Sequence, residues 1–162
     1  MQKGFATLEI IFAALIIALL MTATIPNTVR LADKVSLDYE TKRLYSELRF
    51  LEAMNRSRRF TFIGTGLNDD FDNEFISIKF TSEPMSYQVV SSLGYTGSPV
   101  RETHYLSYGV KLSWKSGKDL YKISTNNFGN LDVTSDTMIL TSRLGNTENI
   151  VFDSVGRIRG AQ

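Results

Sequence analysis

The chain has 162 residues, of which 43% are hydrophobic and 22% are charged, and its formal net charge is +1. This length favours one domain in addition to whatever the N-terminus forms. The small net charge gives no overall field that would indicate nucleic acid or an acidic substrate as a partner. The sequence contains no cysteine, which excludes disulfides, thiolate zinc sites and cysteine nucleophiles.

An apolar segment opens the chain, and residues 10–25 carry no charge. Residues 5–25 number 21, which matches the roughly 20 that a helix needs to cross a bilayer. A buried core helix and a cleaved secretory signal, with Lys3 as its charged region and Ala23 near the cut, are the alternatives. Glu9 disfavours the signal because signals avoid an acid at the head of the apolar stretch. The segment therefore predicts a transmembrane helix behind a short leader.

The sequence GFATLE, which begins at Gly4, resembles the processing site of type IV prepilins and pseudopilins. The resemblance implies that a membrane aspartyl protease, the prepilin peptidase, cuts after Gly4 and methylates the new N-terminal residue, Phe5. The family also has an acid four residues after this Phe, here Glu9, and tends to have a proline 21 residues after it, here Pro26. Ala6 departs from the family, in which Thr is commonest at that position.

Glu9 has a physical explanation that does not depend on the family. A charged side chain deep in a bilayer costs roughly 2.5–3.5 kcal/mol and normally has a partner. Cleavage after Gly4 would make the amine of Phe5 a new cation in the same apolar layer. Glu9 of one subunit is therefore expected to neutralise the amine of a neighbour and to set the register of assembly. The alternative is an acid at the membrane interface, close enough to water to need no partner.

Residues 27–57 have the pattern of an amphipathic helix. Apolar residues recur at helical spacing at Leu37, Leu44, Leu48 and Leu51. Pro26 removes one backbone donor and predicts a kink or a local unwinding. We therefore expect one long helix whose first half lies in lipid and whose second half packs on a globular head.

From Arg58 onward, apolar residues alternate with period two between turns rich in Gly, Asn, Asp and Ser. The pattern predicts an α+β fold, in which the long N-terminal helix packs by its second half on an antiparallel β-sheet head. The expected organisation is a leader at 1–4, a transmembrane and assembly segment at 5–26, and a pilin-like head at 27–162. The predicted strands are 60–63, 75–81, 87–93, 103–114, 120–125, 137–142 and 149–153.

Two further stretches narrow the resemblance. LYSELRFLEAMNRSRRFTF, from Leu44, is similar to the passage from helix to first strand in GspH/FimT-type minor pseudopilins, and NIVFDSVGRIRG, from Asn149, is similar to their closing strand. The resemblance implies a minor pilin or pseudopilin. Many pilins carry a C-terminal disulfide loop, which this chain lacks, and this disfavours a major pilin of that kind.

The C-terminal sequence Gly156-Arg157-Ile158-Arg159 matches a GRxR motif that is associated with DNA binding for uptake in the FimT-like branch. Glycine lets the backbone turn, and two arginines two positions apart in an extended chain point the same way. They can then hold neighbouring phosphates. The resemblance implies that Gly156, Arg157 and Arg159 bind double-stranded DNA. The alternative is a solvated basic tail.

Arg56, Arg58 and Arg59 form a basic cluster at the expected end of the helix. Helix C-termini favour cations through the dipole, which explains the cluster without a ligand. If the cluster lies near Arg157, it would extend a track for phosphates.

Other motifs are weaker. The acidic stretch at 68–74 suggests calcium but lacks the glycine and the distal glutamate of an EF-hand loop. His104 has no cysteine or second histidine with which to form a metal site, and no serine lies in a nucleophile-elbow sequence. We therefore expect neither catalysis nor a cofactor.

The expected function is that of a minor pilin or pseudopilin. It would sit in the bacterial inner membrane as a single-pass protein with the head outside the cytoplasm, and then enter a type IV pilus or a type II secretion pseudopilus. Its expected partners are the prepilin peptidase, membrane lipid, other pilins and the inner-membrane assembly platform, with double-stranded DNA as a further partner in competence. The alternative is a purely structural GspH-like pseudopilin that binds no DNA.

Overall fold

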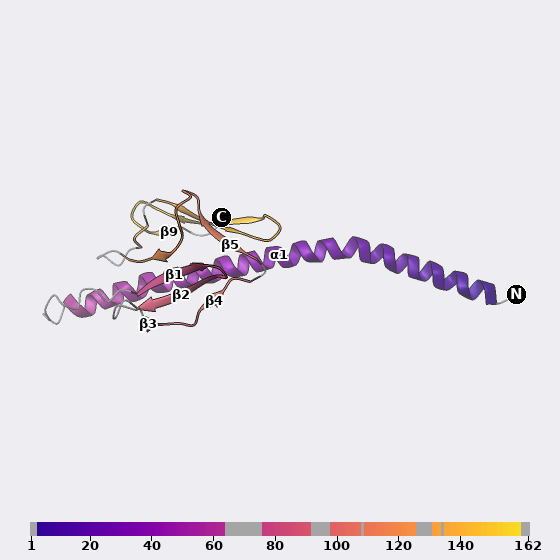
Figure 1. Cartoon of the computed structure of the whole chain (residues 1–162), viewed down its shortest axis with the longest axis horizontal. Helices are drawn as coiled ribbons and strands as arrows, with labels where there is room; N and C mark the ends of the chain where they lie inside the picture. The colour runs from indigo at the N-terminus through magenta and orange to yellow at the C-terminus, as the bar shows by residue number, and fades with distance from the viewer. Residues whose placement is uncertain are drawn as a thin grey trace.

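A single long helix, α1 (Lys3–Ile63), forms the N-terminal part of the computed structural model, which describes residues 3–63, 76–91, 98–107, 109–125, 131–133 and 135–159. Its second half lies against the β-strands, and its first half extends away from them as a stalk (Figure 1). The antiparallel strands gather around one end of the helix only. The predicted α+β fold, with the second half of the helix packed on a β head, is confirmed.

The helix continues through Pro26 without interruption. Proline removes the amide that would bond to the carbonyl of Thr22, but regular helix on both sides retains its own bonds. The local unwinding that we considered at Pro26 therefore does not occur. Figure 1 shows the helix axis bending gradually over this part of the chain.

The first sheet contains β1 (Ile76–Ser82), β2 (Met85–Ser91), β3 (Ser98–Pro99), β4 (His104–Tyr105) and β6 (Lys122–Ile123). The strand order is β3-β2-β1-β6, and β4 pairs with the other end of β2. All of these pairs are antiparallel. Asn55 of α1 fixes the start of this sheet, because its buried side-chain amide exchanges two hydrogen bonds with the backbone of Ile76, of 2.9 and 3.0 Å.

The second sheet contains β5 (Lys111–Trp114), β7 (Thr137–Thr141), β8 (Thr147–Phe152) and β9 (Ile158–Arg159), in the order β5-β7-β8-β9. Here too the pairs are antiparallel. The β7–β8 hairpin lies at the end of the head nearest the stalk (Figure 1). The β8–β9 hairpin carries the last described residues and contributes to the candidate site below.

One hydrophobic core joins the helix to both sheets. Leu44, Leu48 and Leu51 of α1 are fully buried. They belong to one cluster with residues of β1, β7 and β8, among them Ile78, Leu140 and Ile150. Full burial of such a side chain stabilises the fold by about 1.5–3 kcal/mol, so the amphipathic stripe at 27–57 is the surface that holds the head on the helix.

Two strand predictions fail. Residues 60–63 belong to α1, because the first helix-breaking residue after Pro26 is Gly64 and the alternating Phe-Thr-Phe-Ile is accommodated in the last helical turn. The stretch 103–114 divides into β4 and β5, since the backbone turns at Ser107, whose carbonyl accepts from the amide of Val110. The other predicted strands begin within two residues of observed ones.

Candidate functional site

The first half of α1 exposes an apolar surface. Every described side chain from Thr7 to Ala32 is exposed, including large ones such as Ile10, Phe12 and Leu19. Within the described residues, α1 is the one helix long and apolar enough to cross a membrane by length and composition. So much apolar surface is not stable in water and calls for lipid or other helices as its surroundings.

The predicted processing residues lie at the start of this helix. Gly4 and Phe5 are in its first described turns, and their side chains lie outside the described set. Glu9 is exposed on the helix surface. Because Phe5 and Glu9 are four residues apart, they lie on the same helix face, so a mature amine and this carboxylate would share one side of the stalk.

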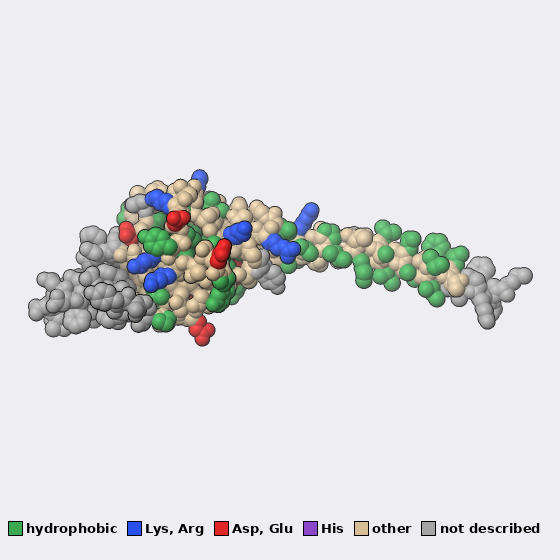
Figure 2. Space-filling view, viewed as in Figure 1, with side chains coloured by type: hydrophobic (Ala, Val, Ile, Leu, Met, Phe, Trp, Pro, Cys, Tyr) green, Lys and Arg blue, Asp and Glu red, His purple; other side chains and the backbone are tan. Residues whose placement is uncertain are grey.

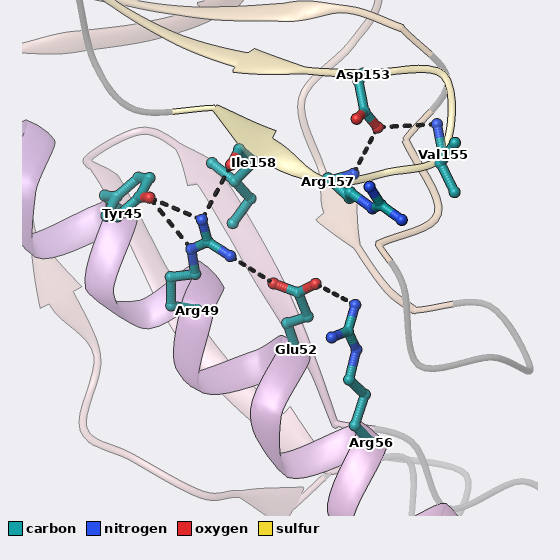
Figure 3. Close-up of polar contacts among 8 residues, drawn as sticks. All are labelled: Tyr45, Arg49, Glu52, Arg56, Asp153, Val155, Arg157 and Ile158. Carbon is teal, nitrogen blue, oxygen red and sulfur yellow. Dashed lines mark hydrogen bonds and ion pairs between the residues drawn. The ribbon is translucent and has the colours of Figure 1, made fainter.

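A groove of about 400 Å³ opens at the far end of the head, between α1 and the β8–β9 hairpin. Four arginines and two acids take part in its lining, and we call it the arginine groove: Arg49, Glu52, Arg56, Asp153, Arg157, Ile158 and Arg159. Four guanidinium groups against two carboxylates leave a local excess of positive charge. Figure 3 shows the helix residues and the hairpin residues as its two walls.

Arg49 joins the two walls. Its guanidinium donates to the Tyr45 hydroxyl at 3.0 and 3.2 Å and to the backbone carbonyl of Ile158 at 3.1 Å (Figure 3). The hydrogen bond from Arg49 to Tyr45 raises the pKa of the Arg49 guanidinium, so this group stays charged. The helix wall is therefore fixed to the last strand by a permanent cation.

Glu52 organises the arginines of the helix wall. Its side chain is almost fully buried and accepts from Arg49 at 3.2 Å and from Arg56 at 2.7 Å, one on each oxygen. Both arginine side chains remain about half exposed, at 48%. Glu52 thus neutralises part of the positive charge while it holds two guanidiniums at the groove surface.

The β8–β9 turn is closed by Asp153. Its carboxylate accepts from the amides of Val155 and Arg157, each at 2.9 Å (Figure 3). The Arg157 amide, followed by the Val155 amide and the charges of Arg157 and Arg159, holds the pKa of Asp153 below its ordinary value. The carboxylate therefore stays ionised and keeps the turn in one conformation.

Gly156 fits this turn for two reasons. Its φ is +74°, a left-handed conformation that favours glycine. A Cβ atom at this position would also overlap with the backbone carbonyl of Leu131. The backbone turn that we predicted at Gly156 is therefore present.

Arg157 and Arg159 are exposed, while Ile158 between them is buried. The predicted common direction of the two arginines agrees with this alternation. The alternative interpretation, a solvated basic tail, is wrong for residues up to 159, because Ile158 and Arg159 form β9 and pair with Phe152 and Val151 of β8. Burial of Ile158 in the core is what holds this strand in place.

Arg56 lies in the same groove as Arg157 and Arg159. This proximity is the condition under which we expected the basic cluster to extend a track of phosphate contacts. The side chains of Arg58 and Arg59 lie outside the described residues, and so does the acidic stretch 68–74. Sequence reasoning missed Arg49 as a groove residue. Its position on the polar face of the helix, seven residues before Arg56, gave no signal of its distant contact with Ile158.

His104 takes part in a buried anchor rather than in a metal site. Its Nε2 lies 2.7 Å from the carboxylate of Glu40, which is fully buried and also accepts from the backbone amide of Ser107 at 3.1 Å. Nearby, Arg101 donates twice to Glu47, at 2.7 Å each. Among the described residues, no group of three or more His, Cys, Asp or Glu side chains is arranged to hold a metal ion.

In comparisons with known proteins, the chain matches no family model, no curated protein and no solved structure.

Proposed function

We propose that the protein is a minor pilin or pseudopilin subunit, which the prepilin peptidase processes and which assembles through its N-terminal helix into a type IV pilus or a type II secretion pseudopilus. The observation that carries the proposal is the exposed apolar half of α1, which ends where the packed head begins. A chain of this shape is suited first to a membrane and then to a bundle of like helices. The inner membrane is the proposed first location, with the head outside the cytoplasm.

The sequence around Gly4 supports the same proposal. Cleavage there would leave Phe5 at the end of an exposed helix, on the face that also carries Glu9. In a bundle of stalks, a carboxylate and an amine at this depth would neutralise each other between neighbouring subunits. Other pilins and the assembly platform are the implied partners.

The first test concerns processing. Gly4→Leu should leave the precursor uncut, because a bulky side chain at the scissile position would not fit the protease. Intact-mass measurement of membrane-extracted protein from the wild type should show a methylated chain that begins at Phe5. A mature chain that begins near Thr24 would identify an ordinary secretory signal and refute the proposal.

The second test concerns assembly. Glu9→Val should still insert and be processed, since it makes the segment more apolar, but it should enter filaments poorly. Thr7→Val is the matched control, because it changes an exposed polar residue on the same stretch without removing a charge. Equal incorporation of the two variants into sheared filaments would show that Glu9 has no role in assembly.

The arginine groove favours a second function, the binding of double-stranded DNA by this subunit. Arg157, just before β9, and Arg159 of β9 line one wall of the groove, and Arg49 and Arg56 line the facing wall. Arginines on two walls can contact phosphates along one backbone without reading the bases. The groove thus suits a weak and sequence-tolerant DNA receptor of an uptake system.

A gel shift with duplex DNA tests this function directly. The full-length chain in a nonionic detergent should retard duplex DNA at low salt, and Arg157→Ala combined with Arg159→Ala should weaken the shift strongly. Absence of any shift by the folded wild type would leave the purely structural subunit as the function.

A further inference from the structure

The β7–β8 hairpin is fixed to α1 just beyond the apolar stalk. Asp33 accepts from the Ser142 hydroxyl at 2.6 Å, from the Asn146 amide group at 2.9 Å and from the Leu144 backbone amide at 3.3 Å. Ser142 and Asn146 are themselves bonded to each other across the turn. The tip of the hairpin is therefore held at a fixed height along the helix.

Exposed basic side chains surround this attachment. Over residues 27–35 and 141–147, every exposed charged side chain is basic, and Asp33 is buried beneath the turn. Lys111 of β5 is also exposed and pairs in register with Thr141, two residues from the tip. We call this group the basic collar: Arg30, Lys34, Lys111 and Arg143. Figure 2 shows Lys and Arg side chains at the junction of head and stalk, beyond a stalk that is mainly hydrophobic.

The height of the collar matches the surface of a membrane. Asp33 lies eight residues beyond Ile25, the last residue of the uncharged run, which is about 12 Å along a helix axis. The headgroup layer on each side of a bilayer is roughly 5–8 Å thick. Arg30 would lie in or just above this layer, and the side chains of Lys34 and Arg143 are long enough to reach back towards it.

The hairpin tip also carries an apolar residue. Leu144 is 49% exposed although its backbone amide is bonded to Asp33. An apolar side chain flanked by cations is suited to the boundary between headgroups and acyl chains. In water, neither the exposed leucine nor the cluster of like charges gains stability from this arrangement.

We propose that the basic collar and Leu144 bind the anionic phospholipid surface of the membrane that α1 spans, and so hold the head upright against the bilayer before the subunit enters a filament. This inference rests on the proposed membrane insertion of α1. Each basic side chain near an anionic surface adds attraction. Basic residues after a transmembrane helix are commoner on the cytoplasmic side, so a collar on a head outside the cytoplasm calls for a local partner, and lipid headgroups are the nearest one.

The experiment uses the absence of cysteine from the chain. Leu144→Cys introduces a unique thiol at the exposed tip, which is labelled with an environment-sensitive nitrobenzoxadiazole fluorophore in the full-length protein. The protein is reconstituted into vesicles of phosphatidylcholine alone or with roughly 30% phosphatidylglycerol. Alkaline carbonate extraction shows separately whether α1 is inserted, which tests the proposed function independently of the collar.

We expect a blue-shifted emission, and quenching by lipids brominated near the headgroup, only in the anionic vesicles. Combined Arg30→Gln, Lys34→Gln and Arg143→Gln should lower the ratio of docked to undocked tip roughly 100-fold and remove both signals. Lys79→Gln, Lys115→Gln and Lys122→Gln form the matched control, because these three exposed lysines lie outside the collar. Raising the salt to about 0.5 M should weaken docking in the wild type.

Equal spectra in neutral and anionic vesicles, with α1 inserted, would overturn the inference. The inference also fails if the collar variant and the control variant behave alike. A blue shift that appears only after assembly into filaments would show that the collar binds neighbouring subunits instead of lipid.

Discussion

The guanidinium of Arg49 donates to the backbone carbonyl of Ile158 at 3.1 Å, across 109 positions of sequence. This hydrogen bond joins α1 directly to β9 at the arginine groove. The same group is held by the Tyr45 hydroxyl and the Glu52 carboxylate. One side chain therefore sets the spacing between the helix wall and the strand wall of the groove.

Arg49→Met should destabilise the head. The change keeps a long side chain but leaves the Ile158 carbonyl without its donor and Glu52 with one partner fewer, which costs about 1–3 kcal/mol. Urea unfolding of the detergent-solubilised chain measures this through the fluorescence of Trp114, whose ring packs edge-on against Phe152 at 5.4 Å.

Lys42→Met is the control for Arg49→Met. Lys42 and Asp38 form an exposed pair at one-turn spacing, which contributes little to stability because solvent screens it. Equal stability of the two variants would mean that the bond between Arg49 and Ile158 contributes nothing to the fold.

Gly156→Ala should lower the stability of the head by more than the strain of a left-handed backbone alone would. Gly156 and Gly145 both have positive φ, +74° and +86°, but a Cβ atom meets the Leu131 carbonyl at Gly156 and no described atom within 4 Å at Gly145. We expect Gly145→Ala to cost about 1–2 kcal/mol, and Gly156→Ala to cost about 1–3 kcal/mol more. Thermal unfolding followed by Trp114 fluorescence measures the stability of both variants. Similar losses of stability for Gly145→Ala and Gly156→Ala would rule out the clash with Leu131.

The sequence predicted those features that depend on local periodicity. The apolar run and the spacing of Leu44, Leu48 and Leu51 predicted the helix and its buried face. The common side of Arg157 and Arg159 followed from the period of two in an extended chain. These features need no knowledge of what the chain packs against.

Features that depend on distant contacts could not be predicted in this way. The role of Arg49 requires β9 beside α1, and the partnership of His104 with Glu40 requires β4 beside the same helix. Strands of two residues, such as β3 and β9, are too short to show alternation. The strand prediction at residues 60–63 was wrong because no glycine or proline separates these residues from the helix before them. The same alternating sequence can therefore continue a helix to its end.

Because Asp33 accepts the hydrogen bonds that attach the β7–β8 hairpin to α1, this attachment should weaken at acid pH. The hydrogen bond from Ser142, with those from Asn146 and Leu144, lowers the pKa of Asp33 below its ordinary value, against the opposing effect of burial. A lowered folded-state pKa means that the stabilisation is complete above the unfolded pKa of about 3.9 and is lost as the pH falls through the folded pKa.

We therefore expect Asp33→Asn to be less stable than the wild type at neutral pH and to approach it in stability as the pH falls below the unfolded pKa of about 3.9. Ser142→Ala removes the main cause of the lowered pKa, so its loss of stability on acidification should be smaller and should be complete at a higher pH. Unfolding curves across this range measure both effects. A constant difference between wild type and Asp33→Asn at every pH would contradict the prediction.

Glu52→Gln should separate stability from DNA binding. The buried carboxylate pairs with Arg49 and Arg56, so its loss should lower stability by about 1–3 kcal/mol. It also removes a negative charge from the groove, which should strengthen binding to duplex DNA a few-fold at low salt. Fluorescence anisotropy with labelled DNA measures the affinity, and weaker binding by a folded variant would count against the groove as the binding surface.

The salt dependence of binding tests Arg157 and Arg159 as phosphate contacts. Nonspecific binding to duplex DNA has dissociation constants of roughly 10⁻⁴–10⁻⁶ M, with a log–log salt slope of about −0.9 for each phosphate engaged. Arg157→Ala with Arg159→Ala should therefore flatten the slope by up to about two units. Stability should change little, because both side chains are exposed.

Arg157→Lys with Arg159→Lys is the sharper comparison, because lysine keeps the charge and loses the paired hydrogen bonds of a guanidinium. Lys79→Ala with Lys122→Ala is the matched control: these lysines lie side by side on β1 and β6, so the same charge is lost on another sheet. If the groove grips phosphates, affinity should fall slightly for the control, further for the lysine variant and furthest for the alanine variant. A control that weakens binding as much as the alanine variant would show that overall charge attracts the DNA, and that Arg157 and Arg159 are two cations among many.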